Sequence, residues 1–144
     1  MEKTFHYLVM SVHLQFQKFL LANLKDTDLT SGQPKVLEYL LYHDGAVQKQ
    51  IAAACHIEPA TITSVLLGMK KNGLIIRKNR NNNRRSLYVY LTDKGRELAE
   101  RIRSEFEIVE ENALVGFSDT EKEMLTRLLA RVNCNMKESN DTDE

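Results

Sequence analysis

The residues in this sequence best suited to binding chemistry are seven basic side chains gathered in one segment. Residues 59–92 contain no aspartate or glutamate, and because the whole chain has a formal net charge of +0, acidic residues are in excess elsewhere. A solvated helix face usually mixes both signs of charge, since opposite neighbours stabilise it. A block of one sign is tolerated where an anion neutralises it, so we expect a phosphate-binding surface and not merely a solvated patch. Its members are Lys70, Lys71, Arg77, Lys78, Arg80, Arg84 and Arg85.

No motif typical of an enzyme or of a metal site accompanies this segment. The six glycines form no phosphate-cradling loop, and no nucleophile motif of the G-x-S-x-G kind is present. Cys55 and Cys134 do not form a C-x-x-C pair, and His6 and His13 are too far apart in sequence for an H-x-x-x-H motif. We therefore predict no catalytic residues, no cofactor and no metal.

Length and composition predict one ordinary domain. The chain has 144 residues, 42% of them hydrophobic, and its apolar runs are shorter than the roughly 18 residues that a membrane span requires. Two cysteines are too few for a disulfide framework, so we expect a cytoplasmic protein without a membrane partner. We interpret Cys55 as a small buried hydrophobe and Cys134 as an interface or surface residue, with redox sensing as the alternative for each.

The elements that must position the basic segment are predicted from apolar spacing and capping signals. Residues 4–24 form one amphipathic helix, and a T-x-x-Q capping box at Thr30 opens a second that stops at Gly45. A third helix spans residues 48–55, and a fourth runs from Pro59 to a stop at residues 72–73.

Beyond residue 73 the apolar period changes from that of a helix to that of a strand. Residues 74–76 and 87–91 read as two strands joined by a polar, basic loop at residues 79–85. Thr92 then caps a long helix, and an S-x-x-E box from Ser118 to Glu121 opens a last one.

This order of elements predicts a mainly α chain with a small β-hairpin, arranged as a winged helix-turn-helix DNA-binding core plus a helical dimerisation region. We assign residues 29–92 to the DNA-binding region, residues 1–28 and 93–137 to dimerisation, and residues 138–144 to an acidic flexible tail. The fourth helix would enter the major groove and the hairpin would reach phosphates and the minor groove. Besides the seven basic residues, the expected DNA contacts are Gln48, Pro59, Ala60, Thr61, Thr63 and Ser64.

The same stretch resembles the signature region of the MarR family of transcriptional regulators. The matching motifs are A-T-I-T at residues 60–63, M-K-K-N-G-L at 69–74, R-R at 84–85 and L-T-D-K-G at 91–95. The resemblance implies a homodimer that binds a roughly palindromic operator near a promoter and represses transcription until a small-molecule or oxidant signal weakens operator binding. It also implies an effector cavity lined from the first, second and fifth helices, with His13, Phe16, Gln17 and Tyr39 as candidates.

The chain departs from the family pattern at several contact positions. Members often carry long polar side chains where this sequence has Ser64 and Gly68, and acidic residues where its loop has Arg80 and Asn83. We therefore expect base reading by short hydroxyl side chains and a steep salt dependence, with a log–log slope of about −5 to −7 if six to eight phosphates are neutralised per dimer. Two alternatives stay open: a winged-helix protein–protein interaction module, and a ligand- or metal-sensing protein with weak DNA binding.

Overall fold

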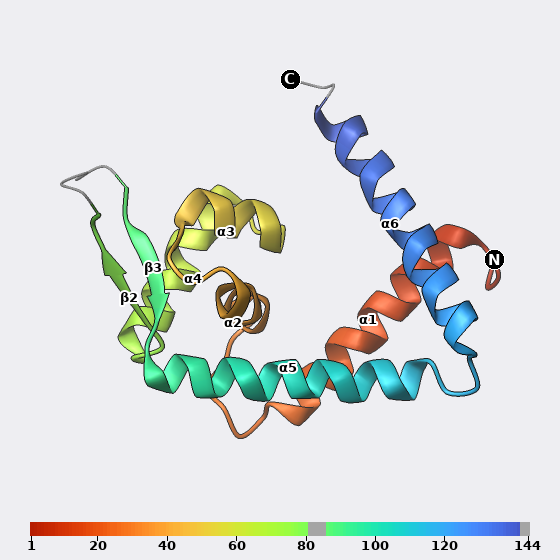
Figure 1. Cartoon of the computed structure of the whole chain (residues 1–144), viewed down its shortest axis with the longest axis horizontal. Helices are drawn as coiled ribbons and strands as arrows, with labels where there is room; N and C mark the ends of the chain where they lie inside the picture. Colours follow the sequence, from red (N-terminus) through yellow and green to blue (C-terminus); the bar gives the residue numbers. More distant parts are fainter. Residues whose placement is uncertain (81–85, 142–144) are drawn as a thin grey trace. The chain divides into compact units, whose positions relative to one another are not determined.

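The computed structural model describes residues 1–80 and 86–141 and divides into two compact units, residues 1–109 and 110–144. The first unit contains the helices α1 (Phe5–Asn23), α2 (Gln33–Tyr42), α3 (Gln48–Cys55) and α4 (Pro59–Lys71), and most of α5 (Asp93–Ala113) (Figure 1). The predicted fold class, mainly helical with a small sheet, is confirmed.

The core of the first unit is apolar and joins the helices to the sheet. Its fully enclosed side chains come from α2, α3, α4, the sheet and α5, and the largest of them are Leu37, Leu40, Ile51, Ile62, Leu66, Met69, Ile75 and Ile102. Burial of this apolar surface is the main force that holds α3 and α4 at fixed positions on α2 and the sheet.

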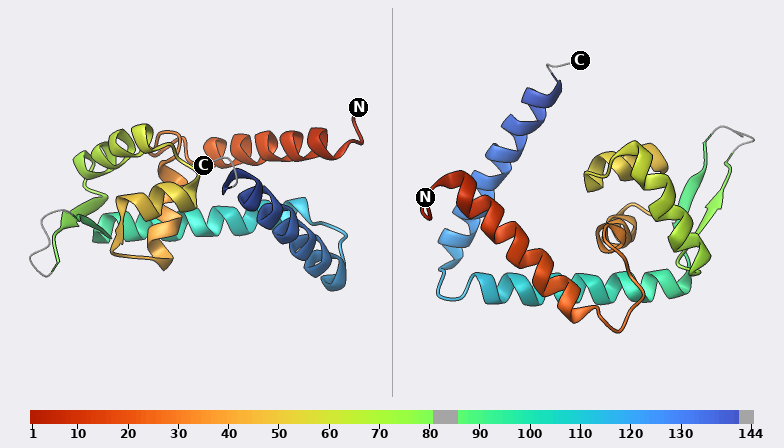
Figure 2. Two further views of the ribbon diagram at one scale, coloured as in Figure 1. Left: turned by 90° about the horizontal axis from the view of Figure 1, so that it is seen from above. Right: turned by 180° about the vertical axis from the view of Figure 1, so that it is seen from behind.

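The sheet has three antiparallel strands in the order β1-β3-β2. Strands β2 (Ile75–Lys78) and β3 (Tyr88–Leu91) form the predicted hairpin, with Arg77 opposite Val89. The third strand, β1 (Ala46–Val47), was not predicted, because two residues are too short to show an alternating pattern. Both views in Figure 2 show the hairpin beside α3 and α4, at the end of α5 where that helix begins.

The helix ends follow the capping signals except at α2. This helix begins at Gln33 and not near Thr30, because Gly32 takes a left-handed backbone with φ of 89° and breaks the helical path. Only half of the expected capping box is present: the Thr30 amide donates to Gln33 Oε1 at 3.1 Å, but the Gln33 amide donates to the Thr30 carbonyl at 3.1 Å and not to its hydroxyl. The helix also ends at Tyr42, before the predicted stop at Gly45.

The caps of α5 and α6 are as predicted. The Gly95 amide donates to the Thr92 hydroxyl at 3.0 Å. In the second unit, Ser118 and Glu121 exchange both bonds of a capping box at the start of α6 (Asp119–Asp141). Helix α6 extends into the segment that we expected to be a frayed tail, and none of its side chains is buried.

Candidate nucleic-acid interface

Helices α3 and α4 form a helix-turn-helix. Their axes bend by 109° at a three-residue turn, within the range usual for this motif. The turn begins at His56, whose left-handed backbone, with φ of 53°, ends α3 and is tolerated outside glycine at an energetic cost. Ile62, Leu66 and Met69 bury one side of α4 in the core, so the opposite side faces solvent.

The exposed side of α4 presents small polar groups at its N-terminal end. Thr61, Thr63 and Ser64 are exposed, as are Pro59 and Ala60 before them. Gln48, the first residue of α3, donates from its amide Nε2 to Thr63 Oγ1 at 2.8 Å. The structure thus brings together the uncharged residues that were predicted to meet DNA.

Lys70 and Lys71 lie at the other end of α4. They are exposed in its last turn, about 16 to 18 Å along the axis from Pro59 at 1.5 Å per residue. Positive charge at this end also stabilises the helix by opposing its dipole. These two lysines are therefore separated from the hydroxyl cluster, and DNA contact by them stays a prediction.

The hairpin carries the other basic residues on an aromatic support. The Arg80 guanidinium lies 4.7 Å from the ring centre of Tyr88 and 5.2 Å from that of Tyr90, and it donates a hydrogen bond to the Tyr90 hydroxyl. The Lys78 ammonium lies 5.6 Å from the centre of the Tyr90 ring. Cation–π contacts of this kind hold the charges to one face of the hairpin. The predicted contacts Arg84 and Arg85 lie outside the described residues.

Arg77 differs from its basic neighbours because part of its guanidinium is buried. The Nε and Nη2 atoms are enclosed and have no hydrogen-bond partner among the residues that the structure describes. Arg77 lies opposite the buried Val89, on the side of the hairpin that continues the core. Burying polar atoms without partners costs free energy, so Arg77 does not stabilise the hairpin through these two atoms, and DNA contact by it stays a prediction.

One acidic side chain ties the hairpin to both flanking elements. Asp44, in the turn between α2 and β1, accepts a hydrogen bond from the Leu91 amide at 2.8 Å through Oδ1. Its Oδ2 accepts from Arg96 Nη2 at 3.0 Å, which adds an ion pair with α5. This role could not be predicted from the sequence, because 47 residues separate Asp44 from Leu91 and no local motif marks the contact.

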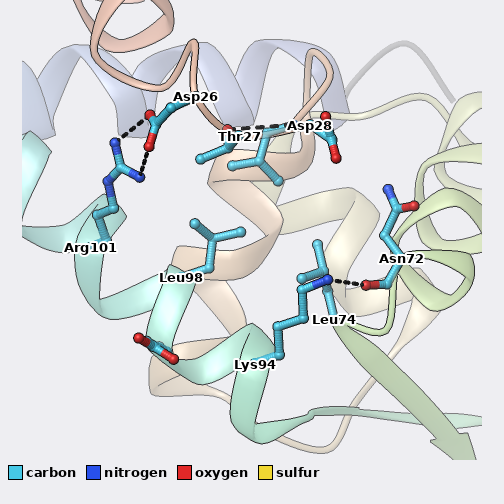
Figure 3. A pocket seen from close by; sticks show the side chains of 10 residues that line it. Asp26, Thr27, Asp28, Asn72, Leu74, Lys94, Leu98 and Arg101 are labelled. Atoms are coloured by element: carbon cyan, nitrogen blue, oxygen red, sulfur yellow. Dashed lines mark hydrogen bonds and ion pairs between the residues drawn. The ribbon is translucent and has the colours of Figure 1, made fainter.

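The C-terminal end of α4 is fastened to the start of α5. The Thr92 hydroxyl donates to the Gly73 carbonyl at 2.6 Å. Lys94 Nζ donates to the Asn72 carbonyl at 2.9 Å (Figure 3). At Gly95 the two backbones meet so closely that a Cβ would lie 2.0 Å from the Leu74 oxygen. Helix α4 and the hairpin therefore share one rigid attachment to α5.

A second fastening joins α5 to the loop after α1. Arg101 makes a bidentate ion pair with Asp26, at 2.7 and 2.8 Å (Figure 3). Arg101 also donates to the Asn23 carbonyl at 3.0 Å. The hydrogen bond from Arg101 lowers the pKa of Asp26 below its ordinary value. The loop is thereby held to α5 by a charged contact, in addition to the burial of Leu24 in the core.

The proposed effector residues fall into two neighbouring cavities. His13, Phe16 and Gln17 line one of about 220 Å³, to whose lining Phe106 of α5 also belongs, with its ring centre 5.8 Å from that of Phe16. Tyr39 lines another, of about 610 Å³, to which His13 also contributes. The structure therefore brings three of the four candidates into one cavity and places Tyr39 in the next.

The cysteines and histidines form no redox or metal centre in the described ranges. Cys55 is buried, and its desolvation raises the pKa of the thiol, which favours an unreactive packing role. Cys134 is exposed on α6. Within residues 1–80 and 86–141, no three or more His, Cys, Asp or Glu side chains are grouped so as to hold a metal ion.

In the same ranges no single helix is long and apolar enough to cross a membrane, although α3 and α4 together, as a bent pair, meet that criterion of length and composition.

Comparisons with known proteins show which family this chain resembles. Residues 29–87 match the family model described as MarR family. An uncharacterised HTH-type transcriptional regulator of Bacillus subtilis, YybA, is 30% identical over 113 residues, which cover 78% of this chain and 75% of that protein. The homoprotocatechuate degradative operon repressor of Escherichia coli is 29% identical over 112 residues, covering 74% of this chain and 72% of the repressor.

A solved structure resembles the chain over nearly its whole length. It is a MarR-family transcriptional regulator from Listeria monocytogenes crystallised with a 26mer DNA, with 27% identity and a TM-score of 0.90, and the match covers 95% of this chain and 91% of that one. These three similar proteins are transcriptional regulators and not enzymes. This chain belongs to the MarR family of DNA-binding transcriptional regulators.

Proposed function

We propose that the protein is a homodimeric repressor that binds a pseudo-palindromic operator and is released by a small molecule. The observation that carries the DNA-binding part is the pairing of an exposed hydroxyl surface at the start of α4 with a basic hairpin on one rigid support. Short hydroxyl side chains can read base edges in the major groove, and arginines can bind phosphates or a narrow minor groove. The similar Listeria regulator, crystallised with DNA, supports this arrangement.

Exposed apolar surface supports the homodimer. In the first unit, α1 exposes large apolar side chains toward its N-terminal end: Phe5, Leu8, Val9, Met10 and Val12. In the second unit, α6 exposes another set: Met124, Leu125, Leu128, Leu129 and Met136. Monomeric proteins rarely leave such faces in water, so we assign both to contacts with a second copy. Two recognition helices would then read half-sites about 34 Å apart.

Charge and shape suggest the class of effector. The cavity around Phe16 and Phe106 is mostly apolar, and Lys35 and His13 contribute basic groups to its lining. An apolar molecule with one acidic group would satisfy both features. We propose such a molecule as the ligand that weakens operator binding.

The test is binding of the protein to a fluorescent fragment of its own upstream DNA, titrated over a range of salt against a scrambled competitor. The proposal expects selective binding, two chains per site and a log–log salt slope of about −5 to −7. Arg84→Glu combined with Arg85→Glu is expected to abolish binding while light scattering still reports a dimer. Selective binding by that double variant would contradict the hairpin assignment. A monomeric wild type would contradict the dimer.

The effector is tested on the same complex. A panel of small aromatic carboxylic acids is added to the protein–DNA complex and release of DNA is followed. Phe16→Ala and Lys35→Gln are expected to reduce the response to an active acid without reducing DNA affinity in its absence. Release that is equally efficient in both variants would place the effector elsewhere.

A further inference from the structure

We propose that Gln48 and Thr63 act together on one base pair: Gln48 orients the Thr63 hydroxyl so that its proton is offered to a hydrogen-bond acceptor on a base edge. This inference rests on the DNA-binding function proposed above and deepens it. It specifies which atoms of the recognition surface donate and which accept.

The two side chains come from different helices and meet at the surface. Gln48 is the first residue of α3, Thr63 lies in the second turn of α4, and Gln48 Nε2 donates to Thr63 Oγ1 at 2.8 Å. Thr63 is exposed and Gln48 is half-buried. Ordering two side chains at a solvated surface costs conformational entropy and gains little net hydrogen-bond energy. The contact is therefore better explained by orientation of the hydroxyl than by stability of the fold.

The direction of this bond decides what Thr63 can offer to DNA. A hydroxyl group has one proton and two acceptor lone pairs, and the Gln48 amide occupies a lone pair. No acceptor among the described residues takes the Thr63 proton, so the hydroxyl is free to donate outward. In the major groove, acceptors lie on guanine (N7 and O6), adenine (N7) and thymine (O4), whereas cytosine presents an amino donor.

The neighbouring hydroxyl is arranged in the opposite sense. Ser64 Oγ lies 2.8 Å from the Thr61 carbonyl oxygen, and because a carbonyl only accepts, the serine proton is used within the helix. Ser64 therefore offers lone pairs, which suit the amino groups of adenine and cytosine. Two adjacent hydroxyls on α4 thus present a donor and an acceptor, which gives this recognition helix sequence information without a long side chain.

Gln48 acts as a positioning residue in this scheme. In helix-turn-helix proteins the first helix of the motif crosses the DNA backbone, so a residue at its start lies near phosphate. Since one amide proton of Gln48 is given to Thr63, the other remains for a phosphate oxygen. The pair would then connect the position of the backbone to the base that Thr63 reads.

The experiment is selection of preferred sites from a random double-stranded DNA library by the full-length protein and its variants. Thr63→Val removes the hydroxyl with little change of shape, and Gln48→Ala removes its orienting partner. Both are expected to lose discrimination at the same base pair of each half-site, by about 3- to 10-fold, the worth of one neutral hydrogen bond. Thermal unfolding should confirm that both variants remain folded.

A third variant tests the direction of the hydrogen bond. In Gln48→Glu the carboxylate can only accept, so Thr63 would donate to it and present lone pairs to DNA. The preference at that base pair is then expected to change toward bases with an amino donor, and most clearly toward cytosine, because adenine also has an acceptor that the wild-type hydroxyl can use. Gln50→Glu is the matched control, because it adds the same charge in the same turn of α3 and a carboxylate can still accept from the Val47 amide, as Gln50 does at 3.1 Å. It should lower affinity for all sequences without changing base preference.

The outcomes separate this inference from the proposed function. A wild-type protein that enriches no sequence overturns both. A wild type that enriches a palindromic site, while Gln48→Ala keeps the full preference or alters a different base pair from Thr63→Val, overturns the inference alone. Loss at one shared base pair, with the change toward cytosine in Gln48→Glu but not in Gln50→Glu, supports it.

Discussion

The start of α4 and the β2–β3 hairpin face the same proposed ligand with opposite chemistry. The helix presents neutral hydroxyls whose protons are directed by Gln48 and by the Thr61 carbonyl. The hairpin presents cations stacked on tyrosine rings, and one cation, Arg77, is left partly buried without a partner among the described residues. Directed hydroxyls discriminate between bases, whereas cations bind every phosphate alike. We therefore expect selectivity and affinity to depend on separate elements, so that each can be altered separately.

Both elements depend on one common joint, where the turn after α4 meets α5. Breaking it should therefore remove selectivity and affinity together. We predict that Gly95→Ala lowers the free energy of unfolding by about 2–4 kcal/mol, because the added Cβ would lie 2.0 Å from the backbone oxygen of Leu74, which cannot move aside cheaply. Chemical denaturation measures this loss.

Gly73→Ala is the matched control for that joint. Gly73 has a positive φ of 73°, but a Cβ there would meet nothing within 4 Å. The expected cost is about 1–2 kcal/mol, the strain of a left-handed backbone alone. An equal or larger loss in Gly73→Ala than in Gly95→Ala would show that close approach of the backbones at Gly95 is not what holds the joint.

Replacing the hairpin's partly buried arginine, Arg77, should keep or raise the stability of the fold and lower the affinity for DNA. In Arg77→Met the aliphatic volume is kept and the unpaired guanidinium is removed, so the fold should be as stable as wild type or more stable by about 1 kcal/mol. Operator affinity should fall by roughly 10- to 100-fold, because a charge-assisted contact is lost in each protomer. Thermal unfolding and DNA titration of the same sample measure the two effects.

Opposite signs for stability and affinity are the signature of that prediction. A variant that loses stability and affinity together would mean that Arg77 has a structural partner in the fold.

The salt dependence of binding distinguishes the hairpin from the far end of α4. Lys78→Gln with Arg80→Gln should reduce the magnitude of the log–log salt slope by up to about 2 per protomer, since each neutralised phosphate contributes about 0.9. Lys70→Gln with Lys71→Gln removes the same charge, yet these lysines lie in the last turn of α4 and should reduce the slope by less than about 1 per protomer. DNA titrations at several salt concentrations provide the slopes.

The two double variants serve as controls for each other, because they differ in position and not in charge. A larger change in slope from the α4 pair would move the phosphate contacts from the hairpin to the end of the recognition helix.

Local signals in the sequence predicted most of this fold. The caps at Thr92 and Ser118 depend on partners three residues away, so the sequence pattern contains the whole interaction. The start of α2 could not be placed in this way, because the left-handed backbone of Gly32 overrides the capping pattern at Thr30. Strand β1 was missed because its pairing with β3 is long-range and only two residues take part.

The candidate site was predictable in its residue types but not in its geometry. Charge counting found the basic segment, and the turn before Pro59 indicated the recognition helix. The sequence could not show that Gln48 contacts Thr63, since 15 residues and a sharp turn separate them. Nor could it show that Arg80 stacks on the hairpin's tyrosines, since opposite strands supply the partners.

The smallest effect on stability is expected for the ion pair of Asp26 with Arg101, which lies outside α4 and the hairpin. Because Arg101 lowers the pKa of Asp26, the pair stabilises the fold above the carboxyl's unfolded pKa of about 4, and this contribution is lost as the pH falls through the lower folded pKa. Asp26→Asn should therefore be slightly less stable than wild type at pH 7, and the difference should disappear as the pH falls far enough to protonate the folded wild-type carboxyl, with DNA binding at pH 7 unchanged. Denaturation at pH 7 and at a series of lower pH values measures the difference. Asp28→Asn removes the same charge from the same loop without breaking an ion pair among the described residues, and an equal loss in that control at pH 7 would assign the effect to loop charge and not to the pair.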